Sequence, residues 1–244
     1  MRTSNPVFAS IERSSTYTDT SAASYAGITL KTFILFGVAI LSGYASLMYV
    51  PAESYMTLIF ISFIVGLIAV FVGSFSVQLA MPAAFVYALA EGVILGLITM
   101  VAEAFAPGAA VAAIVATVAI FFVMLFLYSS RIIRVTTRFR KIMYTILFGI
   151  LFFFIIGGLL QLFTGYSFMM TNGSFNGIAL AITGFMIIYG AFLLTLDFDR
   201  AEAIVSGGAD KKYEWIISIG LMVTIIWLYI EILRLIIILS SRNR

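Results

Sequence analysis

The acidic side chains of this sequence gather in one short stretch. Five of its 11 acidic residues lie within "LDFDRAEAIVSGGADKKYEW", residues 196–215, and apolar runs flank the stretch on both sides. These five are Asp197, Asp199, Glu202, Asp210 and Glu214. Carboxylates that lie close together tend to share a proton or to bind a hard cation such as Ca²⁺. The stretch therefore predicts a site that responds to protons or to Ca²⁺.

Asp197, Asp199 and Glu214 are the candidate ligands of a Ca²⁺ site, and Asp210 is a further candidate for ion gating. Asp197 and Asp199 point about 200° apart on a helix, so only one of them can face the interior. Arg200 follows Asp197 at a spacing that allows a local ion pair. Antiparallel helices on the two sides of the turn would bring Glu214 near both aspartates. The alternative for Glu214 is simple capping of the following helix.

The residue types exclude several kinds of chemistry. The chain has no cysteine and no histidine, so it lacks thiolates, disulfides and the commonest transition-metal ligand. We find no nucleophile–base set, no phosphate-binding loop and no metal-protease motif, which predicts that the protein is not an enzyme and has no cofactor. Its basic residues flank apolar spans, as topology signals do, so we expect no nucleic-acid partner.

The composition places these residues in a membrane. The chain is 63% hydrophobic and 10% charged, whereas soluble domains carry about 25% charged residues. Apolar runs near the ~20 residues that a spanning helix needs predict an all-α integral membrane fold with seven transmembrane helices. The predicted spans are 28–50, 55–76, 80–104, 108–130, 142–163, 175–196 and 214–238.

Lysine and arginine predict the orientation. The strongest cluster, "RIIRVTTRFRK" at 131–141, joins the fourth and fifth spans and is assigned to the cytoplasmic side, where it also meets anionic lipid. The N-terminal tail, residues 1–27, is then cytoplasmic, residues 28–238 form the membrane domain, and residues 239–244 form a short basic tail. Seven spans put that basic tail outside. A last helix that dips into the membrane and returns is the alternative to a full span.

Glu91 lies in the middle of the third span, within "YALAEGVILGLIT". An ionised glutamate there costs several kcal/mol unless it is paired or solvated, so we expect a pore or cavity residue, with a structural hydrogen bond as the alternative. The same span carries small residues at spacings of four, which lets another helix approach closely. These residues are Ala84, Ala88, Gly92 and Gly96.

Three charged residues remain near the first and last spans. Glu231 lies ~25 Å along the last helix from Glu214 and cannot join the acidic turn. Arg234 is placed to neutralise Glu231, since the two are three residues apart. Lys31 is expected to extend from the first span toward the cytoplasmic interface.

Several motifs, spread over nearly the whole chain, resemble the Bax inhibitor/YccA family, also called the transmembrane Bax inhibitor motif family. They are "MRTSNPVF", "GITLKT" at 27–32, "AEGVILG" at 90–96, "RVTTRFRK" at 134–141, the acidic stretch and "VTIIWLYIEILRLI" at 223–236. Their order is similar to that of a bacterial branch, which implies a location in the bacterial inner membrane.

The resemblance implies a seven-helix fold with the last helix in the centre, and a Ca²⁺ leak whose opening responds to pH. It also implies a sensor made of two aspartates, one on the sixth helix and one on the seventh. Asp199 fits the first position, with Asp197 as the near alternative. The second position falls near Thr224, which cannot share a proton, so Glu214 is the expected substitute and Glu231 the other candidate.

Three functions follow as hypotheses. The first is a pH-sensitive leak channel for calcium or other cations. The second is a non-conducting membrane protein that binds a membrane-protein partner and modulates protein turnover or stress responses. The third is a proton-coupled transporter with Glu91 as its proton site, which would drive uphill uptake, whereas a leak runs only downhill.

Overall fold

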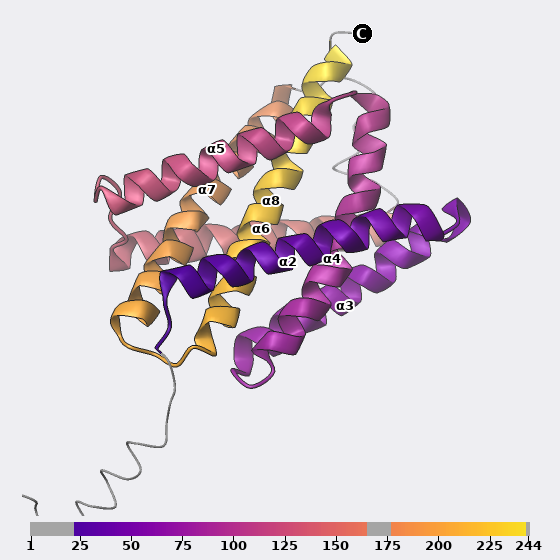
Figure 1. Ribbon diagram of the computed structural model, residues 1–244. Helices are drawn as coiled ribbons and strands as arrows, with labels where there is room; N and C mark the ends of the chain where they lie inside the picture. Colours follow the sequence, from indigo (N-terminus) through magenta and orange to yellow (C-terminus); the bar gives the residue numbers. More distant parts are fainter. Residues whose placement is uncertain (1–21, 165–176, 243–244) are drawn as a thin grey trace, which may run out of the picture.

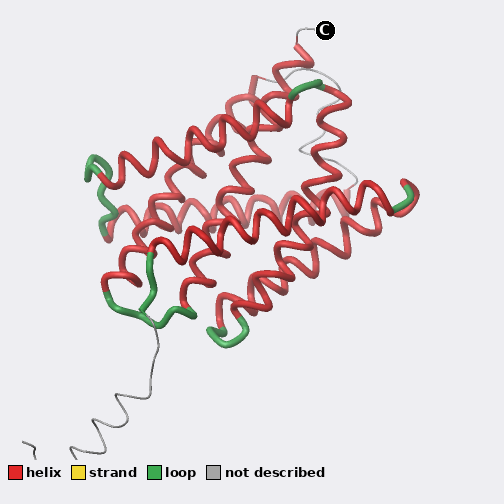
Figure 2. Tube along the Cα trace, viewed as in Figure 1, coloured by secondary structure: helices red, strands yellow, loops and turns green. Residues whose placement is uncertain are grey.

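The protein is a bundle of long helices. The computed structural model describes residues 22–164 and 177–242, which are helical apart from loops, turns and one isolated bridge (Figures 1 and 2). Seven helices are long and apolar enough to cross a membrane, so the predicted all-α, multi-pass membrane fold is confirmed. The helices are α2 (Tyr25–Tyr49), η1 (Ala52–Ser54), α3 (Tyr55–Phe75), α4 (Ala80–Phe105), α5 (Ala109–Ser129), α6 (Thr137–Thr164), α7 (Gly177–Ser206) and α8 (Tyr213–Arg242).

α6 and α7 extend farthest beyond their predicted ends. α6 begins five residues earlier than expected because the Thr136 hydroxyl accepts a hydrogen bond from the Phe139 backbone N–H at 3.1 Å and caps the first turn. α7 continues ten residues past the predicted end at 196, and Gly208 then ends it with a positive φ of 63°. The backbone N–H of Ala209 reaches back to the Ile204 carbonyl at 3.2 Å, which closes this helix end.

α8 runs through the middle of the bundle (Figure 1). It packs against α2, α3, α4, α5 and α7, which agrees with the expected central position. α6 packs its backbone against α7 alone among the described helices, so five helices and not six surround α8. α8 is one unbroken helix of 30 residues, which favours the full span over a helix that dips and returns. Residues 239–242 of the predicted basic tail belong to this helix.

The small-residue stripe on α4 forms a close helix contact, as expected. A Cβ atom at Gly92 would overlap the backbone of Ala39, and one at Gly96 would lie 2.8 Å from the Gly43 carbonyl oxygen. Ala88, one turn before Gly92, is fully buried in the same contact. α2 and α4 therefore meet backbone to backbone and form a rigid pair beside α8.

The loop 130–136, the turn 207–212 and residues 22–24 gather at one end of the bundle, which we call the basic end (Figure 1). The backbone N–H of Ala23 donates to the Ala209 carbonyl at 2.8 Å, so the start of the described chain is joined to the α7–α8 turn. Residues 1–21 of the predicted N-terminal tail lie outside the described residues. α2 already begins at Tyr25, three residues before the predicted span.

Candidate functional site

A buried carboxylate lies between α7 and α8. Asp197 is 7% exposed, and its Oδ2 accepts a hydrogen bond of 2.6 Å from the Thr224 hydroxyl. Its Oδ1 lies 3.9 Å from an Nη atom of Arg200, so the predicted local pair forms, but loosely. Thr224 also donates within its helix to the Gly220 carbonyl at 3.2 Å. One carboxylate thus joins the two helices that carry the acidic turn.

Asp199 lies on a different side of α7. It forms an ion pair with Arg140 of α6, and its side chain is 19% exposed. The helical rotation between the two aspartates separates them, as expected. The residue that faces Thr224 is therefore Asp197, the near alternative, and not Asp199. The sequence could not decide between Asp197 and Asp199, because the residue that faces α8 depends on the rotation of α7 about its own axis.

Loop 130–136 is attached to α7 through a third carboxylate. Glu202 accepts hydrogen bonds from Arg131 at 2.6 Å and from the Tyr128 hydroxyl at the end of α5. The backbone of Arg131 has a φ of 59°, which residues other than glycine seldom adopt. The hydrogen bond to Glu202 raises the pKa of the Arg131 guanidinium, which is charged at neutral pH in any case. The basic run therefore does more than set topology, because it forms ion pairs with α7.

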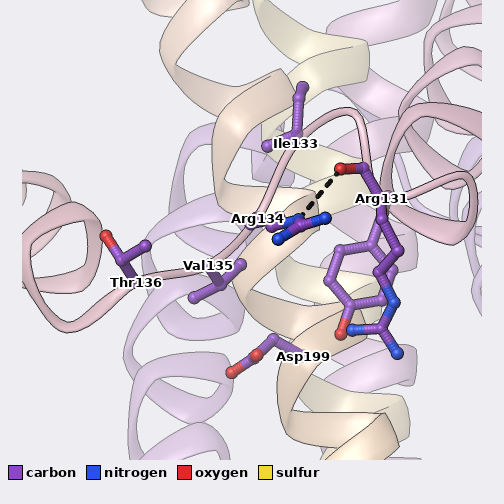
Figure 3. A pocket seen from close by; sticks show the side chains of 7 residues that line it. Arg131, Ile133, Arg134, Val135, Thr136 and Asp199 are labelled. Carbon is purple, nitrogen blue, oxygen red and sulfur yellow. Dashed lines mark hydrogen bonds between the residues drawn. The ribbon is translucent and has the colours of Figure 1, made fainter.

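A pocket of about 480 Å³ opens beside these ion pairs (Figure 3). It is lined by Tyr128, Arg131, Ile133, Arg134, Val135, Thr136 and Asp199. The Arg134 side chain lies across it and donates to the Arg131 carbonyl at 3.4 Å. The pocket gives solvent access to Asp199 at the basic end, whereas Asp197 is buried one half-turn earlier on α7.

Glu214 binds the first helix and not the aspartates of α7. Its side chain is fully buried. It accepts a hydrogen bond from Lys31 Nζ at 2.6 Å and another from the Ser24 backbone N–H at 2.8 Å. Lys31 also lies over the Trp215 ring at 4.9 Å and donates to the Lys211 carbonyl of the α7–α8 turn at 3.1 Å, so it extends toward the basic end as predicted. Glu214 opens α8 ten residues before Thr224, ~15 Å along the axis.

The structure does not bring together the three carboxylates that were predicted as Ca²⁺ ligands. No group of three or more acidic side chains that could hold a metal occurs in residues 22–164 and 177–242. Asp197, Asp199 and Glu214 each have a different basic partner, namely Arg200, Arg140 and Lys31. The stretch 196–215 lies on α7, the turn 207–212 and the start of α8, and these three carboxylates pair with residues of α7, α6 and α2.

Asp210 has a structural role in the turn. Its Oδ1 accepts a hydrogen bond from the Lys212 backbone N–H at 2.8 Å, and its backbone carbonyl accepts one from the Tyr213 N–H at 2.9 Å. These contacts start α8. They show how the turn is built and give the gating prediction for Asp210 no support.

The remaining candidates lie deeper in the bundle. Glu91 is half-buried on α4, one turn after the buried Tyr87. Glu231 is 8% exposed, and Arg234 lies 3.9 Å from it, so the predicted pair on α8 forms loosely. Thr224 and Glu231 lie seven residues apart and share a face of α8.

The basic partners that come from other helices, Lys31 and Arg140, were not predicted from the sequence. Lys31 and Glu214 are 183 residues apart, and Arg140 and Asp199 are 59 apart. The only signal in the sequence was the predicted placement of opposite charges on one side of the membrane. That signal indicates that pairs can form but does not indicate which residues pair.

Comparison with known proteins agrees with the fold and the motifs. A family model described as Bax inhibitor 1 like matches residues 5–241, nearly the whole chain. A search of curated proteins finds no match. The match spans all seven helices, including Asp197 and Thr224. The chain belongs to the Bax inhibitor 1-like family.

Proposed function

We propose that the protein is a pH-sensitive leak path for Ca²⁺ or other cations, gated where Asp197 meets Thr224. The observation that supports this best is a carboxylate that is 7% exposed between α7 and the central helix. An acidic residue buried at such a place in a membrane bundle is costly and is commonly functional. The similarity to the Bax inhibitor family supports the same function.

The proposed gate works through the charge on Asp197. A charged carboxylate accepts a charge-assisted hydrogen bond from Thr224 of α8, which holds α7 against α8, and it also attracts Arg200 within α7. A proton on Asp197 removes its negative charge, which weakens the hydrogen bond to Thr224 and ends the attraction to Arg200. Arg200 is then left with the Tyr144 hydroxyl of α6, to which it already donates. Lower pH therefore favours separation of the two helices and a higher leak rate.

The neighbouring charges are suited to hold the rest of α7 in place. Asp199 pairs with Arg140, and Glu202 pairs with Arg131, so both carboxylates have partners outside α8. Thr224 is the polar group on α8 that bonds Asp197. Since threonine does not titrate, one carboxyl replaces the aspartate pair that the family resemblance implies, and the pH response should follow a single proton.

We propose that the basic end faces the cytoplasm of a bacterial cell, because its loops hold the strongest arginine cluster. The gate then lies near the inner face of the membrane. Transport and not catalysis is proposed, because the chain lacks histidine and cysteine and shows no nucleophile–base set.

Reconstitution tests this function. Purified protein in liposomes loaded with a Ca²⁺-sensitive dye should admit Ca²⁺ faster than empty liposomes, and the rate should rise as the pH falls from about 8 to about 5. Influx no faster than in empty liposomes at any pH would contradict the leak. A stable copurifying membrane protein would then favour the non-conducting role.

A further inference from the structure

The central helix contains two buried polar atoms without partners. Glu231 Oε2 and Trp227 Nε1 form no hydrogen bond within the described part of the chain. One is an acceptor and the other is a donor, and a buried polar atom without a hydrogen-bond partner destabilises the fold. Such a combination inside a membrane bundle indicates that a polar ligand or water belongs there.

The two atoms lie close together on α8. Trp227 and Glu231 are four residues apart, which places their side chains on one face, a single turn from each other. The Trp227 ring packs on Tyr189 of α7 at 6.0 Å, so this face is turned toward α7. A single water could accept from the indole N–H and donate to the carboxylate.

Arg234 only partly neutralises Glu231. Its nearest Nη atom is 3.9 Å from the carboxylate, and its side chain is 44% exposed. By contrast, Lys31 contacts the buried Glu214 at 2.6 Å. Glu231 therefore keeps an oxygen available to a ligand, while Glu214 has its two oxygens engaged by Lys31 and Ser24.

Glu231 lies on the same face of α8 as Thr224, the residue that contacts Asp197 at the proposed gate. It lies seven residues beyond Thr224, two turns and ~10.5 Å farther from the basic end on the same face. A cation moving along this face would meet the carboxylate of Asp197 at one depth and that of Glu231 at the next. A pair of weak binding positions in series suits conduction, because ions must also leave.

We infer that Glu231, with water held by Trp227, forms a hydrated binding position for a divalent cation in the half of the bundle away from the basic end. This inference deepens the proposed leak and rests on it for its physiological meaning. One carboxylate and waters are a hard-oxygen ligand set, which suits Ca²⁺. A lone carboxylate holds the ion weakly and does not make a resident metal centre.

Terbium luminescence tests the position without any measurement of flux. The chain has two tryptophans, Trp215 and Trp227, so Trp215→Phe leaves Trp227 as the sole tryptophan. Tb³⁺ added to this variant in detergent should emit when tryptophan is excited at the red edge of its band, where tyrosine does not absorb. Ca²⁺ should compete with the signal, and Trp227→Phe should abolish it.

Neutralising Glu231 and neutralising Arg234 should change the affinity for Tb³⁺ in opposite directions. In the Trp215→Phe background, Glu231→Gln should weaken Tb³⁺ binding about tenfold or more, because it removes the only charged ligand. Arg234→Gln should strengthen binding, because it removes the competing cation. If Glu231→Gln does not fold, the Arg234→Gln result decides. An unchanged affinity in either folded variant, or a wild-type signal that Trp215→Phe abolishes, would overturn the inference.

The test separates this inference from the proposed leak. Ca²⁺ influx that responds to pH, without Tb³⁺ emission from Trp227, would overturn the Glu231 position and leave the leak standing. Tb³⁺ emission that requires Glu231, in a protein without influx, would support the binding position and contradict the leak.

Discussion

Glu214→Gln is expected to lower the free energy of unfolding by ~3 kcal/mol, because it leaves Lys31 without its buried counter-charge. The Glu214 side chain is fully buried and that of Lys31 is 12% exposed, so water cannot readily replace the lost contact. The same carboxylate also accepts from the Ser24 backbone N–H, which fixes the start of α2. Unfolding in mixed micelles, followed by circular dichroism, measures the change.

The control and the double variant make this prediction specific. Glu53→Gln removes an exposed carboxylate and should leave the unfolding midpoint unchanged. Lys31→Met combined with Glu214→Leu should recover much of the loss, because replacing both members of a buried pair by apolar residues is often neutral. A Glu214→Gln protein as stable as the wild type would show that the pair contributes little.

Gly92→Ala is expected to destabilise the protein by about 2 kcal/mol, because the new methyl group would overlap the Ala39 backbone. Backbone atoms cannot rotate away as a flexible side chain can, so α2 and α4 would have to move apart. The consequence extends to α8, because both helices pack against it. The thermal unfolding midpoint in detergent is the appropriate measurement.

Gly37→Ala is the matched control on the opposite side of α2. A Cβ atom at Gly37 meets nothing within 4 Å, so the change should leave stability equal or raise it by about 0.5–1 kcal/mol. Equal effects of Gly92→Ala and Gly37→Ala would refute the close contact between α2 and α4.

The sequence predicted the helices well because each span is a long apolar run. It misplaced the end of α7 because residues 197–206 are rich in charge, which resembles a solvated loop. In the structure Asp199 and Glu202 pair with arginines from α6 and from loop 130–136, so a charged helix continues where a turn was expected.

The candidate site was predicted only in part. The sequence identified Asp197 and Thr224 as candidates, but it did not show that they contact each other. That contact depends on the rotation of α7 about its own axis, which no local pattern encodes. Glu214 was misassigned because its partner, Lys31, comes from the other end of the chain.

The pH dependence of Ca²⁺ influx in Asp197→Asn liposomes tests the proposed gate most directly, with Asp199→Asn as the matched control. Asparagine cannot ionise, so Asp197→Asn should give one high influx rate from about pH 5 to about pH 8. Asp199→Asn should keep the wild-type rise at low pH, because Asp199 faces Arg140 and not α8. An Asp197→Asn protein with the wild-type pH profile would contradict gating at this carboxylate.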